Sequence, residues 1–316
     1  MNIRILTVGK LKEKAYPSLC DEYVKRYIHE KLDDFREKSP RFEYLFRRLI
    51  RNVRSVVGDM AAELARSDFK PLDFELDFGS VSSLPPVELG EEDSKLVLTG
   101  IADRVDGYYH EGKLYVRVVD YKTGRKKFSL SDVWYGMGLQ MLLYLFALSR
   151  SGWERYGAEI VPAGVMYVPA RDVLVSAGAD ISDEAILEEK LKSLRRSGLV
   201  LDDEKILRAM EKSDEPVYIP VTVKKGVYSG EGLASAERLG LLSRHIDATL
   251  QDMAREMHTG CIAADPYYRS SGENACRFCD YASACHFGGE EDKIRYLEKF
   301  KAAEFWKRLE EGGEQP

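Results

Sequence analysis

Three charged residues in two neighbouring stretches of the chain are suited to metal-dependent phosphodiester hydrolysis. "GIADRVD" contributes Asp103, and "VVDYK" contributes Asp120 and Lys122. Successive strand side chains alternate between faces, so Asp120 and Lys122 share one face.

Two adjacent antiparallel strands would bring a carboxylate from each to a common point, where a cation between them would relieve their repulsion. Carboxylate oxygens suit Mg²⁺ or Mn²⁺. Lys122 beside the ion could stabilise charge on the attacked phosphate or help orient water. The alternative interpretation is a structural ion-pair network at the end of a sheet.

A second candidate site consists of cysteines near the C-terminus. Cys276, Cys279 and Cys285 have the spacing C-x₂-C-x₅-C, Cys261 precedes them, and Cys20 lies alone far upstream. The stretch "MNIRILTVGK" lacks the apolar core and small-residue cleavage site that are typical of a signal peptide, so we expect a cytoplasmic chain. In such a chain, clustered cysteines indicate metal ligation more readily than disulfides. Thiolates at this spacing could hold zinc or an iron–sulfur cluster.

The elements that must position these residues follow from apolar periodicity and turn signals. The predicted elements are, in order, helices over 17–67, a strand over 71–79, a two-strand meander over 95–124, a helix over 129–150, a strand over 162–170, a charged helical region over 183–212, a β-rich piece over 216–230 and a helix over 234–260. Ser39 before Pro40 marks a helix start. Asp106, which precedes Gly107, is predicted to be a turn residue. This order of elements predicts an α/β core.

Composition is that of a globular protein, with 44% hydrophobic and 32% charged residues in 316. No apolar stretch is long enough to span a membrane, and we expect a cytoplasmic protein without membrane contact. The net charge of −6 gives no overall basic field. Two local basic patches, one with Arg47, Arg51 and Arg54 on one helical face and one in "KTGRKK", are either solvated edges or DNA contacts. No P-loop is present in the sequence.

The motif around Asp103, Asp120 and Lys122 resembles the PD-(D/E)XK nuclease superfamily, and specifically its RecB-like branch. In that branch a helix after the lysine carries glutamine and tyrosine one turn apart, and "QMLLY" supplies Gln140 and Tyr144. A spacing of four puts both on one helix face, which can lie against the site. The resemblance implies that these five residues are catalytic and that Asp103 and Asp120 bind Mg²⁺ or Mn²⁺. Upstream, Glu75 in "FELDFG" could add a further metal ligand.

The flanking sequences "SPRFEYLFRRL", "DVWYGMGLQMLLYL" and "PAGVMYVP" resemble the C-terminal nuclease region of the AddB family of helicase/nuclease subunits. The resemblance implies a restriction-endonuclease-like core with flanking helices and a C-terminal cysteine segment. It also implies a Mg²⁺-dependent deoxyribonuclease, expected to be an exonuclease, that acts on DNA beside an AddA-type helicase–nuclease subunit. The cysteine spacing is similar to that of relatives with a [4Fe–4S] cluster. This implies Cys276, Cys279 and Cys285 as ligands, with Cys20 slightly favoured over Cys261 as the fourth.

The expected organisation has four parts: residues 1–16 as a foreign-looking start, 17–70 helical, 71–260 the nuclease domain, and 261–316 the cysteine segment with a terminal helix. The first fourteen residues resemble the start of a SPOUT-class ribosomal RNA methyltransferase, but the binding elements of that class are absent, so we reject a methyltransferase. We expect an AddB-type fragment without helicase motifs. The alternative is a catalytically inactive remnant that still binds DNA or the partner subunit.

Overall fold

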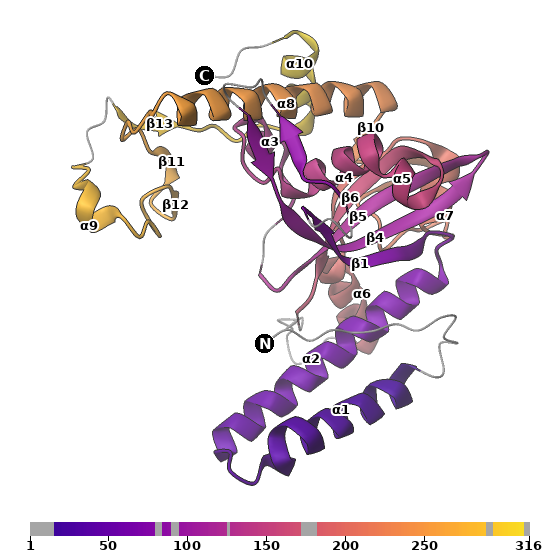
Figure 1. Ribbon diagram of the computed structural model, residues 1–316. Helices are drawn as coiled ribbons and strands as arrows, with labels where there is room; N and C mark the ends of the chain where they lie inside the picture. The colour runs from indigo at the N-terminus through magenta and orange to yellow at the C-terminus, as the bar shows by residue number, and fades with distance from the viewer. Residues whose placement is uncertain are drawn as a thin grey trace.

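The computed structural model describes residues 16–79, 84–89, 95–124, 127–171, 182–288 and 293–312. The described chain begins with a helical hairpin made of α1 (Tyr16–Leu32), the short 3₁₀ helix η2 (Asp33–Phe35) and α2 (Pro40–Ala65), as Figure 1 shows. Ser39 caps α2, because its side chain accepts a hydrogen bond from the Phe42 backbone N–H, and Pro40 occupies the first helical turn. This helix start was predicted from the sequence and is confirmed.

The centre of the fold is a six-stranded mixed sheet of order β1-β4-β5-β6-β7-β10. The strands are β1 (Lys70–Phe78), β4 (Gly100–His110), β5 (Lys113–Lys122), β6 (Glu159–Pro169), β7 (Ser197–Leu201) and β10 (Leu233–Ala234). Strands β1, β4 and β5 form an antiparallel meander, while β6 lies parallel to β5. The tight turn between β4 and β5 falls within "HEGK", at Glu111 and Gly112, which both have positive φ, so the two-strand meander expected over 95–124 turns there. The α/β class is therefore confirmed.

Within the described ranges, three smaller sheets lie outside the central one. They pair β2 (Val87–Leu89) with β3 (Leu96–Leu98), β8 (Thr222–Lys224) with β9 (Val227–Ser229), and β11 (Tyr267–Ser270) with β12 (Glu273–Asn274) and β13 (Arg295–Tyr296). Figure 1 shows the last of these sheets, together with α9, reaching out beyond one end of α8. We call this projection, described over residues 261–288 and 293–296, the cysteine arm.

The remaining helices are α3 (Leu130–Trp134), α4 (Gln140–Ser151), α5 (Trp153–Tyr156), α6 (Asp183–Leu194), α7 (Glu204–Met210), α8 (Ala236–His258), α9 (Ala282–Cys285) and α10 (Ala302–Glu310). Helix α4 packs on β5 and β6, and its leucines Leu142, Leu145 and Leu148 are completely buried. Val116 and Val118 of β5 belong to the same core, which α8 and α10 extend. None of the helices in the described ranges is both long and apolar enough to cross a membrane.

The structure corrects two predicted elements. The single helix expected over 129–150 is divided into α3 and α4, because Gly136 and Gly138 between them adopt φ of 73° and 69°, which a continuing right-handed helix excludes. The helical region expected over 183–212 contains β7 between α6 and α7. The expected foreign start, apart from Tyr16, lies outside the described residues.

Candidate active site

The two predicted metal-binding aspartates lie across from each other on neighbouring strands. Strands β4 and β5 are antiparallel, with Arg104 paired to Val119, and one further step along this register places Asp103 opposite Asp120. The Asp103 carboxylate accepts a hydrogen bond from the Tyr121 backbone N–H through Oδ2, at 2.9 Å. The β meander therefore brings both carboxylates to one place, as the sequence motif predicts.

Lys122 completes this pair on the same face of β5. Its Nζ lies 2.6 Å from Asp120 Oδ2 and 5.6 Å from the centre of the Tyr167 ring on β6. The Asp120 side chain is only 12% exposed, and its Oδ2 has this ion pair but no hydrogen bond of regular geometry. Burial, together with the nearby charges of Asp120 and Asp132, raises the pKa of Tyr167 to about 12, so its phenol stays neutral beside the lysine.

Glu75 brings a third carboxylate into electrostatic reach. It lies in β1 between two residues paired with Arg104 and Ala102, which puts it level with Asp103 on the next strand. Burial and the negative charges of Asp120 and Glu75 raise the pKa of Asp103 above its ordinary value, against the opposing effects of the Tyr121 N–H and Lys122. Glu75 also has a φ of 49°, which is unusual for a side chain other than glycine. The site therefore carries more negative than positive charge.

Gln140 and Tyr144 share one face of α4, as predicted. Gln140 Nε2 donates to the Tyr144 hydroxyl over 3.0 Å, and the Tyr144 ring stacks on Phe78 of β1 with centroids 4.8 Å apart. The hydroxyl lies against Gly100 at the start of β4, where an added Cβ would come within 2.1 Å of it. Gly100 begins the strand that carries Asp103, so the Gln140 and Tyr144 pair of α4 packs against the start of that strand.

The donor set fits a hard divalent cation. Asp103 and Asp120 lie at opposite positions of neighbouring strands, their charges influence each other, and Asp120 Oδ2 is buried without a regular hydrogen bond. No three histidine, cysteine, aspartate or glutamate side chains are gathered around one point among the described residues. An ion here would therefore rest on two carboxylates together with water or substrate oxygens, a coordination that Mg²⁺ commonly accepts.

The cysteine arm holds its thiols at the surface. Cys276, Cys279 and Cys285 are exposed and unbonded, as is Cys261 just beyond α8. A turn links the first two, since the Cys279 N–H donates to the Cys276 carbonyl over 3.3 Å. Cys20 falls in α1, and Figure 1 shows α1 at the bottom of the view, well separated from α9 at the left. The structure thus places three predicted ligands in one short segment and does not bring the helix with Cys20 to them.

The basic face of α2 is engaged in part by neighbouring acids. Arg47 pairs with Glu43 one turn earlier, at 2.7 Å, and Arg54 pairs with Asp21 of α1, at 2.6 Å. Both pairs are exposed, and the second joins the two helices of the hairpin. Contact between this face and DNA stays a prediction.

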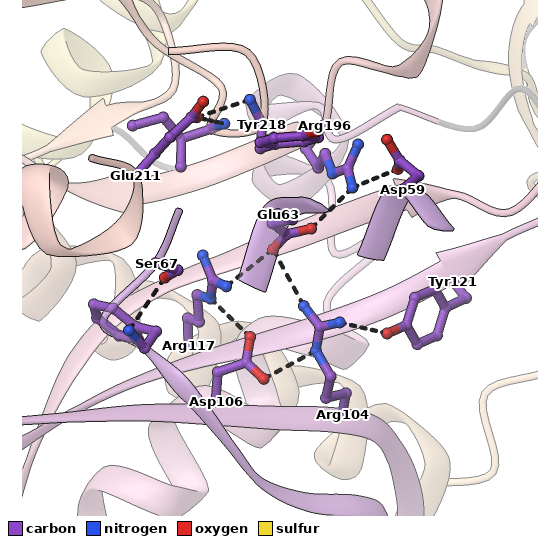
Figure 2. A network of polar contacts seen from close by, with 12 residues as sticks. Asp59, Glu63, Ser67, Arg104, Asp106, Arg117, Tyr121, Arg196, Glu211 and Tyr218 are labelled. Atoms are coloured by element: carbon purple, nitrogen blue, oxygen red, sulfur yellow. Dashed lines mark hydrogen bonds and ion pairs between the residues drawn. The ribbon is translucent and has the colours of Figure 1, made fainter. Parts of the chain in front are cut away.

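The opposite face of the same strands carries a buried ion network that the sequence motif did not predict. Figure 2 shows Glu63 of α2 among three guanidinium groups, those of Arg104, Arg117 and Arg196. Glu63 Oε1 lies 2.9 Å from Arg117 Nη2 and 3.3 Å from Arg104 Nη2, and Oε2 lies 2.8 Å from Arg196 Nη2. Arg196 also contacts Asp59 at 2.6 Å. Although burial by itself raises the pKa of Glu63, the three arginines lower it to about 2.

Asp106 belongs to this network, so its prediction as a turn residue is wrong. It is completely buried, and its oxygens lie 2.9 Å from Arg104 Nε and 2.9 Å from Arg117 Nε. Strand β4 continues through Gly107, which pairs with Val116. The available signal was an arginine within each apolar run, "ADRVD" and "YVRVVD", since a charged residue inside a buried strand needs a partner.

Comparisons with known proteins agree with this geometry. The profile of the PD-(D/E)XK nuclease superfamily matches residues 6–286. A protein of Thermoanaerobacter sp. (strain X514) is 36% identical over 305 residues, covering 92% of this chain and 26% of its own length. Proteins of Clostridium acetobutylicum and Clostridium novyi (strain NT) are each 32% identical, covering 92% and 97% of this chain and 26% and 27% of their own lengths. The names of all three describe a subunit of an ATP-dependent helicase/deoxyribonuclease. The chain spans about a quarter of the length of these curated relatives.

Proposed function

This chain belongs to the PD-(D/E)XK nuclease superfamily, and from that premise we propose that it is the DNA-cleaving module of an AddAB-type helicase–nuclease. The observation that carries the proposal is the placement of Asp103 across from Asp120, with Lys122 Nζ 2.6 Å from Asp120 Oδ2. Two carboxylates and one lysine at the end of a sheet form a site for a cation and a phosphate together. The names of the relatives, which contain helicase and deoxyribonuclease, support the choice of DNA as substrate.

Each side chain has a separate task in this proposal. Asp103 and Asp120 would hold Mg²⁺ or Mn²⁺, and Glu75 would supply a further oxygen through a water on the ion. When bound, the ion polarises the phosphate and lowers the pKa of water. Lys122 stabilises the negative charge that grows on the attacked phosphate. Gln140 and Tyr144 line the approach to the carboxylates and orient the DNA backbone through their amide and hydroxyl groups.

The proposed setting is double-strand break repair in the cytoplasm, where the module degrades a strand from its end as an exonuclease. The partner would be an AddA-type helicase–nuclease subunit that feeds DNA to the site. The support for this setting is the set of relatives, which are subunits by name and about four times as long as this chain. Their length agrees with the expectation that helicase motifs lie outside the matched region.

The cysteine arm is proposed to bind a [4Fe–4S] cluster. Cys276, Cys279 and Cys285 would supply three thiolates, and their exposure leaves them accessible to an assembling cluster. Cys20 is the fourth ligand that the family resemblance implies, and Cys261 is the alternative within the arm itself. Binding would gather thiols that the structure leaves apart and would thereby order the arm.

A cleavage assay with linear and circular single-stranded DNA tests the nuclease proposal. We expect the linear DNA to be degraded with Mg²⁺ or Mn²⁺ and to be intact with EDTA, while circular DNA, which has no end, is spared. Asp120→Asn protein purified in parallel controls for contaminating nucleases. Cleavage of circular DNA would show that the protein acts as an endonuclease and not as an exonuclease. DNA binding without any cleavage would favour the inactive remnant, and neither binding nor cleavage would refute the proposal.

A further inference from the structure

Two residues outside the sequence motif connect the back of the sheet to the candidate metal site. Tyr121 lies between Asp120 and Lys122 on β5, but its side chain points to the opposite face. There its hydroxyl accepts a hydrogen bond from Arg104 Nη1, at 2.6 Å, and its ring lies 5.6 Å from the guanidinium carbon. Figure 2 shows this contact at the edge of the buried ion network.

The same tyrosine acts on the front of the sheet through its backbone. Its N–H donates to Asp103 Oδ2 over 2.9 Å, so the position of the Tyr121 peptide sets the orientation of that carboxylate. Asp120 and Lys122 are its immediate neighbours in sequence. A displacement of the Tyr121 main chain would therefore disturb all three residues of the motif at once.

Arg104 occupies the equivalent position on β4, next in sequence to Asp103. It is completely buried, and its Nε lies 2.9 Å from Asp106 Oδ1 while Nη2 lies 3.3 Å from Glu63 Oε1. Asp106 of the same strand and Glu63 of helix α2 therefore hold the guanidinium that donates to Tyr121. A rigid, fork-shaped donor of this kind holds its acceptor in one geometry.

We infer that Arg104 and Tyr121 are positioning residues, which fasten β4 to β5 behind the site and so hold the Asp103 and Asp120 carboxylates at the separation that a divalent cation requires. The inference rests on the proposed function. Residues that orient metal ligands from behind typically change metal affinity or activity about 10–100-fold when they are replaced. They do so without touching the ion, the DNA or the reacting atoms.

The central test is Tyr121→Phe, which removes one hydroxyl and keeps the ring. We expect Mn²⁺ affinity, measured directly by calorimetry on the DNA-free protein, to fall about tenfold. We also expect kcat on linear single-stranded DNA to fall about tenfold with KM unchanged, because the DNA contacts are left intact. The matched control is Asp59→Asn, which weakens the same network at its contact with Arg196, away from β4 and β5. This control should lower the melting temperature but keep Mn²⁺ affinity.

The second variant is Arg104→Lys, which keeps a positive charge for Asp106 and Glu63 but loses the fork that reaches Tyr121. Arg104→Lys should also lower the affinity for Mn²⁺, and it tests the positioning role if Tyr121→Phe does not fold. Unchanged Mn²⁺ affinity in a folded variant, or an equal loss in Asp59→Asn, would overturn the positioning role. If the wild-type chain binds Mn²⁺ and cleaves DNA while the variants behave in one of these two ways, this inference is refuted and the proposed function is not. A wild-type chain that does neither refutes the proposed function and this inference with it.

Discussion

Lys122 provides the counter-charge for Asp120, since its ammonium lies 2.6 Å from a carboxylate oxygen that is buried and has no regular hydrogen bond. The two residues are neighbours on one face of β5, and the lysine side chain is 29% exposed. In the proposed function the same lysine would neutralise Asp120 in the metal-free protein and would contact the phosphate of the substrate when Asp120 holds a cation.

Lys122→Ala tests the second of these roles. We expect the rate of DNA cleavage to fall about 10²–10³-fold, because a positive charge aimed at the developing transition state is lost. The protein should remain folded, although the free energy of unfolding falls, because the buried Asp120 carboxylate loses its counter-charge. The control is Lys113→Ala, which removes the exposed pair with Glu159 at the start of the same strand. Cleavage at the wild-type rate by Lys122→Ala would exclude a catalytic role for this lysine.

Asp103→Asn tests whether the carboxylates form a cation site. The pKa of Asp103 is raised above its ordinary 3.8, by burial first and then by Asp120 and Glu75. Ionisation therefore opposes folding, and this penalty is absent below the ordinary pKa and complete above the raised one. At pH 7 without metal, the variant should melt at a higher temperature than wild type, and the difference should shrink as the pH falls. In calorimetry the variant should bind Mg²⁺ more weakly.

Asp120→Asn distinguishes the repulsion between the Asp103 and Asp120 carboxylates from the attraction between Asp120 and Lys122. It should also weaken Mg²⁺ binding, but it leaves Lys122 without its partner, so we expect no comparable rise in melting temperature. Wild-type Mg²⁺ affinity in both variants would support a purely structural ion-pair network instead.

Glu63→Gln tests the buried network. Removing one charge from among three arginines should lower the free energy of unfolding by about 3–5 kcal/mol at pH 6. The pKa of Glu63 falls from 4.5 to about 2 on folding, so its ionisation stabilises the native state fully above pH 4.5 and progressively less as the pH falls towards 2. At pH 3 the gap between wild type and variant should therefore be smaller by about 2 kcal/mol. Urea titrations at both pH values measure this gap.

The control variant is Glu188→Gln, which also removes one carboxylate, but an exposed one that pairs with Lys192 on α6. A gap between wild type and Glu63→Gln that is the same at pH 3 and pH 6 would contradict the lowered pKa.

Anaerobic reconstitution tests the cysteine arm. We expect about four iron atoms per chain, lost in each of Cys276→Ser, Cys279→Ser and Cys285→Ser. Loss in Cys20→Ser with retention in Cys261→Ser would support the ligand set that the family resemblance implies, and the reverse result would assign Cys261. If wild-type protein takes up no iron under these conditions, the arm does not bind a cluster.

Local patterns were sufficient to predict the strands that bear the motif. Alternating apolar residues on both sides of "HEGK" predict a hairpin, and its register then places Asp103 near Asp120 without further information. Gln140 and Tyr144 follow from helical spacing in the same way. The break before α4 was missed because a strong apolar periodicity outweighed two glycines, Gly136 and Gly138.

The buried network was not predicted because its contacts join distant parts of the chain. Glu63 meets residues 41, 54 and 133 positions away, and no periodicity within a helix or strand indicates such partners. Asp106 was assigned to a turn from the glycine beside it, whereas its true constraint is Arg117 on the next strand. For the same reason, the contact between Arg104 and Tyr121 appears only when the strands are paired.

The network in Figure 2 also constrains how this protein can evolve. Asp59, Glu63 and Asp106 supply three negative charges to balance the three arginines, and Glu63, Asp106 and all three arginines are buried. Loss of one partner leaves an unpaired charge in the interior and lowers the free energy of unfolding. Replacement of the whole set by well-packed apolar groups can leave that free energy unchanged. We therefore expect divergence at these positions to proceed through compensated exchanges, in which the charges behind the site are kept together or lost together.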